Sequence, residues 1–353
     1  LSIGVIIIVV IIVLSVLNRL LIVQPVKFVS NEMQAVGSGD LQRHIEHHKN
    51  DEIGDMTRSF NTMVHGLQGF TQYVSKDVVQ QILETGTSRI AGTSTKVAIF
   101  FSDIRSFTSI TETYPANDVV NMLNSYFDTM VPIIQESGGN LDKFIGDAIM
   151  AEWGGIEASD KDPYQACYAA LLQLDALNHF NEKRRKSATF EINIGMGINY
   201  GEAIVGTIGS EGKMEFTVIG DAVNLASRLE GLTKEYGVKI IISHSIAEHV
   251  QDYFLCRELD KVAVKGKVEG VRIYELVGRK LDVSPDTINN INKYHDALSL
   301  YRNKEFDASI KILDSISDFV TNKAAQRLKY IAKEYLISPP SSDWNGISIK
   351  TSK

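Results

Sequence analysis

Two aspartates, Asp103 and Asp147, are the residues in this sequence best placed to do chemistry. Asp103 comes just after Val97–Phe101, an apolar run typical of a buried strand. Asp147 belongs to Gly146-Asp147, a tight hairpin signal between two further apolar segments. If the hairpin lies edge to edge with the first strand, the two carboxylates meet. Such a pair can hold two Mg2+ ions roughly 3.5–4 Å apart, which suits in-line attack on a phosphate.

Asp103 alone supports a simpler interpretation, in which it ends a strand and caps the next helix. A helix is expected after the turn that ends at Thr108, and its free backbone N–H groups favour an anion near Asp103. The second acid, Asp147, favours the metal–phosphate interpretation.

A sheet with helices is needed to position these side chains, and residues 96–278 have the pattern of one. The predicted strands are Val97–Phe101, Leu141–Ile145, Ala148–Trp153, Phe190–Asn199, Ala203–Ile208, Lys239–Ile242 and Ile273–Val277, and the predicted helices are Asn117–Glu136, Asp162–Arg185 and Ala222–Tyr236. The order strand, helix, hairpin, helix, strand predicts an α+β fold with a ferredoxin-like core and additions.

Three motifs follow one another in this region. They are Phe101-Ser-Asp103-Ile-Arg-Ser-Phe107-Thr108, Asp142-Lys143-Phe-Ile-Gly-Asp147 and Thr217-Val-Ile-Gly-Asp-Ala-Val-Asn224-Leu-Ala-Ser-Arg228. Together they resemble the catalytic domain of class III nucleotidyl cyclases, over residues 96–278. The resemblance implies an adenylate cyclase, in which the ribose 3′-oxygen of ATP attacks the α-phosphorus and expels pyrophosphate to give cyclic AMP.

The resemblance also implies a head-to-tail homodimer with active sites shared across its interface. One chain would supply the metal ligands Asp103, Asp147 and the backbone of Ile104 for two Mg2+ or Mn2+ ions per site. The amides of Phe107 and Thr108 match positions that hold the triphosphate.

The other chain would supply the second half of each site. Lys143 and Thr217 match the pair that reads the purine, Asn224 the residue that orients the ribose, Arg228 the residue that stabilises the transition state, and Lys265 a lysine that contacts the polyphosphate. Asn224 and Arg228, four residues apart, share one face of a helix. Arg also offers a rigid fork of donors for phosphoryl oxygens.

Lys143 and Thr217 favour ATP over GTP. Lys143 can donate to the ring acceptor of adenine, and the Thr217 hydroxyl can accept from its amino group. Guanylyl members of the family carry Glu and Cys at these places. The Lys/Thr pair looks like that of the bicarbonate-responsive subgroup, which leaves a bicarbonate response open. Where some relatives have an Arg aimed at a phosphate, this chain has Glu202.

The chain opens with a membrane-span pattern at residues 1–18. Leu1–Leu17 carries no charge, and apolar residues continue to Val23, which is long enough to cross a bilayer. A signal peptide is the alternative, but a basic leading segment and a small-residue cleavage site are missing. Arg19 and Lys27 follow the span, so the rest of the chain is expected in the cytoplasm, anchored to the cell membrane. The start inside the apolar run, without Met, indicates a fragment whose upstream sensor region is absent.

Residues 19–69 resemble a HAMP signal-relay module. Two heptad seams separated by a polar connector predict a parallel coiled coil between two chains; their apolar positions are Ile22, Val26, Val29, Met33 and Val36, then Ile53, Met56, Phe60, Met63, Leu67, Phe70 and Val74. A plain amphipathic stalk is the alternative. Residues 70–95 form a linker to the catalytic domain.

The composition limits which functions and which cellular compartment are compatible with this chain. The net charge of −7 and the lack of a long basic face argue against nucleic-acid binding. Cys167 and Cys256 fit no metal-ligand spacing and indicate buried thiols in a reducing compartment. Residues 279–353 form a helical tail, part of which resembles one tetratricopeptide-like helix pair. Two rival functions remain: a guanylate cyclase, and a catalytically dead cyclase domain serving as a relay module, which would lack a metal acid or transition-state residue.

Overall fold

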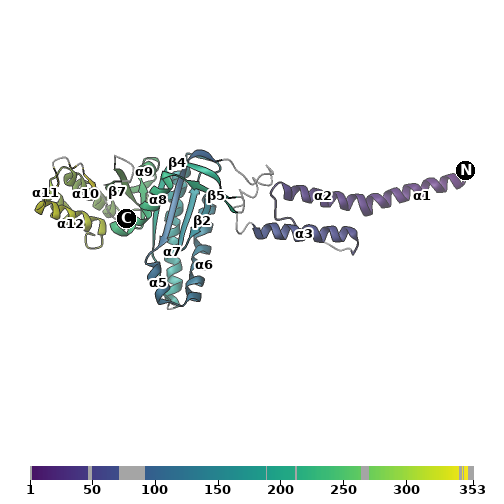
Figure 1. Cartoon of the computed structure of the whole chain (residues 1–353), viewed down its shortest axis with the longest axis horizontal. Helices are drawn as coiled ribbons and strands as arrows, with labels where there is room; N and C mark the ends of the chain where they lie inside the picture. Colours follow the sequence, from purple (N-terminus) through teal and green to yellow (C-terminus); the bar gives the residue numbers. More distant parts are fainter. Residues whose placement is uncertain are drawn as a thin grey trace. The chain divides into compact units, whose positions relative to one another are not determined.

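The computed structural model describes residues 2–46, 50–70, 92–187, 189–210, 213–263, 270–341, 344 and 346–348. The chain forms two compact units, Leu1–Ile90 and Ala91–Lys353 (Figure 1). The predicted linker, residues 70–95, lies largely outside the described residues.

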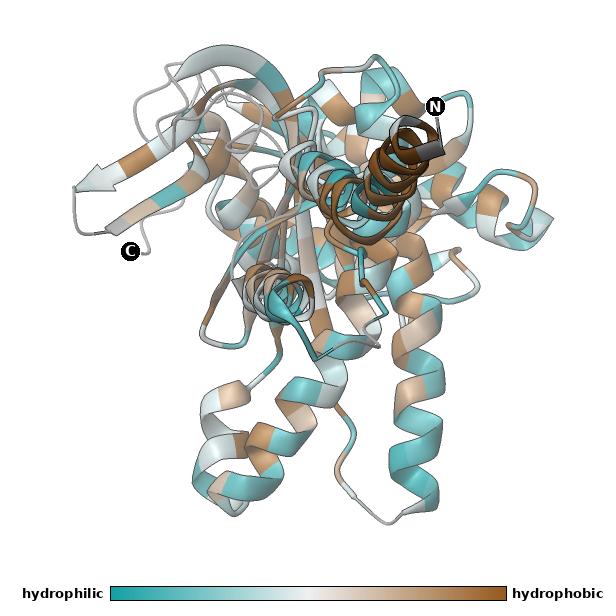
Figure 2. Cartoon of the chain, turned by 90° about the vertical axis from the view of Figure 1, so that its right-hand side faces the viewer, coloured by the Kyte–Doolittle hydropathy of each residue, from teal (hydrophilic) through white to brown (hydrophobic). Residues whose placement is uncertain are grey.

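The first unit begins with a long apolar helix. It consists of α1 (Ser2–Asn18), a π-helical turn η1 (Arg19–Val23) and α2 (Gln24–Gly37). The stretch Ile3–Gly37 is long and apolar enough to cross a membrane. Figure 2 shows its N-terminal part coloured as hydrophobic on all sides. A helix that is apolar all round suits a lipid environment better than a protein surface.

The helix α3 (Glu52–Phe70) follows the connector and packs with α2 around a small core. The buried residues of this core are Val29, Val36, Ile45, Phe60 and Val64. The Asn61 side chain fixes the connector on α3, because it accepts from the Ile45 N–H at 3.0 Å and donates to the Ile45 carbonyl at 2.9 Å. Other members of the predicted seams remain exposed in the single chain, namely Ile22, Val26, Met33 and Met63.

The second unit is built on one nine-stranded mixed sheet. Its strands are β1 (Thr93–Ile104), β2 (Asn140–Ile145), β3 (Ala148–Trp153), β4 (Ile194–Ser210), β5 (Lys213–Ile219), β6 (Ile240–Ser243), β7 (Phe254–Val262), β8 (Val271–Arg279) and β9 (Ile347–Ser348). The order is β2-β3-β1-β4-β6-β8-β7-β9, with β5 paired to β4. The predicted α+β class is confirmed.

The prediction of two strands at Phe190–Asn199 and Ala203–Ile208 is wrong. They form one strand, β4, because its residues 194 to 205 pair without a break with β1. The prediction places no strand at β5, β7 or β9, and no helix at α9 (His244–Val250).

Helices cover both faces of the sheet. Ala98 and Phe100 of β1 face a core that includes α6 (Ala116–Glu136), α7 (Asp162–Lys186) and α9. Val97, Ile99 and Phe101 face the opposite core, together with α8 (Asp221–Tyr236). Alternate residues of a strand point to opposite faces, so burial on both sides explains the continuous apolar run.

The C-terminal helices belong to this second unit. They are α10 (Pro285–Arg302), α11 (Phe306–Asp314) and α12 (Lys323–Ile337). Leu229 and Tyr236 of α8 share one buried cluster with Tyr294 and Leu298 of α10 and Leu328 of α12. The tail is therefore packed on the helix that carries Asn224 and Arg228.

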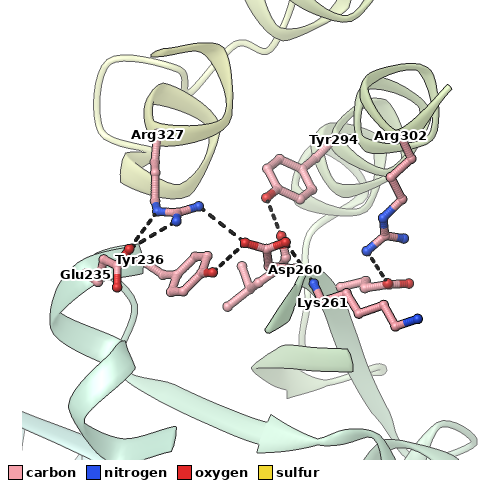
Figure 3. A network of polar contacts seen from close by, with 9 residues as sticks. Glu235, Tyr236, Asp260, Lys261, Tyr294, Arg302 and Arg327 are labelled. Atoms are coloured by element: carbon pink, nitrogen blue, oxygen red, sulfur yellow. Dashed lines mark hydrogen bonds and ion pairs between the residues drawn. The ribbon is translucent and has the colours of Figure 1, made fainter. Parts of the chain in front are cut away.

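Arg327 on α12 ties the tail to the domain (Figure 3). It donates to Glu235 at 3.0 Å and pairs with Asp260 Oδ2 at 3.5 Å. The Tyr236 hydroxyl donates to the same Asp260 oxygen at 2.6 Å. The Arg327 guanidinium also lies 4.3 Å from the centroid of the Tyr236 ring. Arg327 therefore connects the C-terminal end of α8 with the strand β7.

We expect Arg327→Ala to lower the free energy of unfolding of this unit by about 3 kcal/mol, because it removes a cation from the buried Asp260. Denaturant unfolding followed by tryptophan fluorescence measures this, since the chain's 2 tryptophans, Trp153 and Trp344, lie in this unit. Arg185→Ala is the control. It removes a solvent-exposed pair with Glu191 and should leave the unfolding midpoint almost unchanged, because water already screens that pair. Equal losses in the two variants would contradict the assigned role of Arg327.

Candidate active site

The strand β1 and the β2–β3 hairpin bring the two predicted acids together. Ser102 pairs with Ile149 across the antiparallel β1–β3 register, so Asp103 comes level with the start of β3, beside the hairpin turn. Gly146 has φ +66° in that turn, a conformation that glycine adopts without strain. The Ile104 N–H donates to Asp147 Oδ2 at 3.2 Å, and the Asp103 carboxyl lies close enough to raise the pKa of Asp147.

Burial, the side-chain contact with Asp103 and the charge of Asp103 together raise the pKa of Asp147 to about 7. Two carboxylates that share one point disfavour a second negative charge. A divalent cation relieves this repulsion, so it would bind in competition with the proton.

The donor set suits a hard, oxygen-preferring cation. Among the described residues, no group of three or more His, Cys, Asp or Glu side chains is arranged to hold a metal ion by itself. Asp103, Asp147 and the backbone oxygen of Ile104 would therefore leave positions for water and for phosphate oxygens. Mg2+ is commonly bound in this way, by one or two carboxylates together with substrate phosphates.

The turn after Ile104 leads into the short helix α5 (Phe107–Thr113). Ser106 precedes α5 in the left-handed region, at φ 58°, which is uncommon for a residue other than glycine. Phe107 packs against the main core and Thr108 is exposed. The backbone of these two residues therefore begins a helix close to the acid pair, as the sequence predicts.

The predicted purine pair converges on Asp142, a β2 residue whose side chain is only 1% exposed. The Thr217 hydroxyl, on β5, donates to the Asp142 carboxylate at 2.8 Å, and the Val218 N–H donates to it at 3.1 Å. Lys143 Nζ lies 3.5 Å from Asp142 and 2.7 Å from Glu215 of β5. The acidic partners of Lys143 are therefore Asp142 and Glu215.

Asn224 and Arg228 are both exposed on α8, one turn apart, as predicted. The helix lies against the sheet at Gly197 of β4. A Cβ at that position would overlap the backbone of Ala226 and Glu230. The missing side chain at Gly197 therefore sets how closely α8 approaches the sheet.

An ion pair connects the acid-bearing end of β1 with α8. Arg105 follows the acid-bearing end of β1, and its Nη1 lies 3.2 Å from Glu230 Oε1 on α8. Burial raises the pKa of Glu230 to about 7, although the charge of Arg105 opposes the increase. Gly195 makes room for this guanidinium, because a Cβ there would overlap it.

Two predicted features have different outcomes. Lys265 lies in 264–269, outside the described residues. Glu202, which replaces an expected basic residue, is exposed on β4 and sits opposite Lys96 of β1. The roles of all the predicted site residues stay predictions.

Sequence reasoning missed four polar residues that support the site: Asp142, Glu215, Arg105 and Glu230. Asp142 and Arg105 stand within recognised motifs, but no local pattern reveals their partners. The Asp142–Thr217 contact spans 75 positions and the Arg105–Glu230 contact spans 125. Only the tertiary structure brings such residues together.

Comparison with known families identifies two matching regions. Residues 90–278 match the adenylate and guanylate cyclase catalytic domain, and residues 17–69 match the HAMP domain. Among curated proteins, an adenylate cyclase of Anabaena cylindrica is 36% identical over 274 residues, which cover 71% of this chain and 54% of that protein. Adenylate cyclase 1 of Rhizobium meliloti is 33% identical over 228 residues, covering 64% of this chain and 34% of the relative. The chain thus spans about half or less of these relatives' length.

Solved structures give the same fold. The adenylyl cyclase CyaB from P. aeruginosa is 33% identical with a TM-score of 0.51, covering 55% of this chain and 100% of that one. The guanylyl cyclase Cya2 is 31% identical, also with a TM-score of 0.51, covering 55% and 98%. A bacterial light-regulated adenylyl cyclase is 26% identical with a TM-score of 0.56, covering 65% of each chain. Because both adenylyl and guanylyl cyclases share the fold, the choice of purine depends on individual side chains.

Proposed function

Because this chain belongs to the family of adenylate and guanylate cyclase catalytic domains and also carries a HAMP domain, we propose that it is an adenylate cyclase, which converts ATP into 3′,5′-cyclic AMP and pyrophosphate. The observation that carries the proposal is the meeting of Asp103 and Asp147 beside the start of α5. Divalent cations bound there would neutralise the polyphosphate and lower the pKa of the ribose 3′-hydroxyl. The names of the curated relatives support adenine as the base.

Residues of one chain then bind and orient the triphosphate. Asp103, Asp147 and the Ile104 carbonyl would hold the cations, and the amides of Phe107 and Thr108 would donate to phosphate oxygens. Lys265 would add a mobile positive charge at the leaving pyrophosphate. The exposed Glu202 adds no positive charge, so phosphate binding depends on these other groups.

The second copy of the chain would complete each site. Asn224 of the partner subunit would orient the ribose, and Arg228 of the partner subunit would hold the α-phosphate as negative charge develops on it. Both side chains are exposed on α8, where a nucleotide bound to another chain can reach them. Sharing of this kind needs a head-to-tail homodimer.

The N-terminal unit would anchor and regulate this dimer. The apolar helix would cross the cell membrane once, and the basic residues Arg19 and Lys27 would place the catalytic unit in the cytoplasm. The seam residues exposed in the single chain would pack between two HAMP modules and pass on the state of the membrane segment.

A turnover assay with the purified chain tests the function. We expect cyclic AMP from ATP with Mg2+ or Mn2+, far less cyclic GMP from GTP, and no product when the metal is chelated. Assays with and without bicarbonate test the subgroup resemblance separately. Cyclic GMP as the main product would contradict the assigned substrate, and no product with either nucleotide would contradict the cyclase activity itself.

A further inference from the structure

We propose that Asp142 determines the purine selectivity of this site, by fixing the Thr217 hydroxyl as a hydrogen-bond acceptor toward the base. The inference rests on the proposed function, because it takes Lys143 and Thr217 as the residues that meet the purine. Asp142 itself would not touch the nucleotide. It is a positioning residue that acts through Thr217.

The surroundings of Asp142 consist of hydrogen-bond donors. The Thr217 hydroxyl lies 3.0 Å from Oδ1 and 2.8 Å from Oδ2, the Val218 N–H lies 3.1 Å from Oδ2, and Lys143 Nζ lies 3.5 Å from Oδ1. Burial raises the pKa of the Asp142 carboxyl, whereas Thr217, Lys143 and Val218 oppose the increase. A carboxylate with these neighbours can only accept.

A hydroxyl has one hydrogen to donate and two lone pairs to accept with. Since Asp142 takes the hydrogen of Thr217, the hydroxyl presents only lone pairs in other directions. In water a threonine hydroxyl can donate or accept a hydrogen bond, but the contact with Asp142 leaves Thr217 only as an acceptor toward a ligand.

Lys143 is constrained in a complementary way. Its ammonium group has three N–H donors and no acceptor. Glu215 takes one at 2.7 Å and Asp142 attracts a second, so a third remains to be offered to a ligand. Burial lowers the pKa of Lys143, but the hydrogen bond to Glu215 and the charges of both acids produce a net increase, which keeps the group charged.

The pair thus presents one donor and one acceptor in fixed places. Adenine matches this pattern, because its ring nitrogen accepts and its amino group donates. Guanine presents a carbonyl acceptor and a ring N–H donor, so its carbonyl would meet the lone pairs of Thr217. A site that leaves buried polar groups unpaired with the wrong ligand rejects that ligand strongly.

The variant Asp142→Asn tests the inference. The amide oxygen is expected toward the Val218 N–H, which places the NH2 group beside the Thr217 oxygen. Thr217 can then accept from this NH2 group and donate outward to a guanine carbonyl. We expect the ratio of kcat/KM for GTP to that for ATP to rise about tenfold, which corresponds to about 1.4 kcal/mol, because Thr217 would then hydrogen-bond to guanine instead of adenine.

Glu215→Gln is the matched control. It weakens the hold on Lys143 without touching the contact between Thr217 and Asp142. This control is expected to slow both nucleotides and to leave the GTP-to-ATP ratio within about twofold of the wild type. Asp142→Glu keeps a carboxylate at this position and should therefore retain most of the preference for ATP that Asp142→Asn loses.

The possible outcomes distinguish the role of Asp142 from the cyclase activity on which it rests. An unchanged ratio in Asp142→Asn, with cyclic AMP still formed by the wild type, would overturn the role of Asp142 and leave the cyclase assignment intact. Equal changes in Asp142→Asn and Glu215→Gln would overturn it too, because they would indicate general damage to the purine site. A wild type that forms no cyclic nucleotide would overturn both the role of Asp142 and the cyclase activity. If Asp142→Asn does not fold, Asp142→Ser removes the charge with a smaller side chain and should raise the same ratio.

Discussion

Mixed dimers of an Asp103→Ala chain and an Arg228→Ala chain are expected to regain about half of the wild-type cyclase activity, because one of their two sites is intact. Each variant alone should lose at least about 10³-fold, since every site in it lacks a metal ligand or the arginine at the α-phosphate. Two affinity tags on co-expressed chains allow the mixed dimers to be purified and their turnover of ATP to be measured.

The matched control for this experiment pairs Asp103→Ala with Asp147→Ala. Both defects then fall in the same half-site, on the touching strand and hairpin, so each site of the mixed dimer carries one of them. This pair should remain inactive. Recovery of activity in the control, or equally low activity in both mixed dimers, would contradict the proposal that each site combines the acid pair of one chain with α8 of the other.

Gly197→Ala is the second substitution with a large expected effect. The new Cβ would overlap the backbone of Ala226 and Glu230, and backbone atoms in a packed helix cannot move aside as a flexible side chain can. We expect α8 to shift away from β4, which would lower the free energy of unfolding by about 2–3 kcal/mol. Turnover should fall by about 10²-fold, because a shift of this kind displaces Asn224 and Arg228.

Gly231→Ala, on the same helix, is the control. Nothing lies within 4 Å of a Cβ at this exposed position, and alanine favours a helix interior over glycine by about 1 kcal/mol. This variant should therefore gain stability and keep its turnover. Denaturant unfolding and an ATP turnover assay on both variants test the pair. Full activity in Gly197→Ala would contradict the idea that the contact between α8 and β4 positions the catalytic side chains.

The acid pair could be predicted because its signals are local. A continuous apolar run ends near Asp103, and Gly146-Asp147 encodes a two-residue turn that sequence alone reveals. The extent of β4 could not be predicted in the same way. Gly195, Gly197 and Gly201 interrupt its apolar pattern, although the first two are needed for the close approach of Arg105 and α8.

The sequence pattern does not predict the strands β5 and β7 for a related reason. Their charged residues resemble those of a surface loop, but in the fold they have partners from distant segments. Glu215 of β5 holds Lys143 at 2.7 Å, and Arg257 of β7 holds Glu275 at 2.6 Å. The charge of Arg257 is buried, which is tolerated only because it is paired, and neither pairing can be inferred from the local sequence pattern.

The cluster that joins α8 to α10 and α12 also shows that the family match is shorter than the segment that folds as one unit. The family match ends at residue 278, yet Leu229, Tyr236 and Leu259 are covered by residues beyond it. A chain cut at that boundary would leave these side chains in water and would lose the partner that Arg327 provides for Asp260. A shortened chain for crystallisation or kinetics should therefore keep α10, α11 and α12.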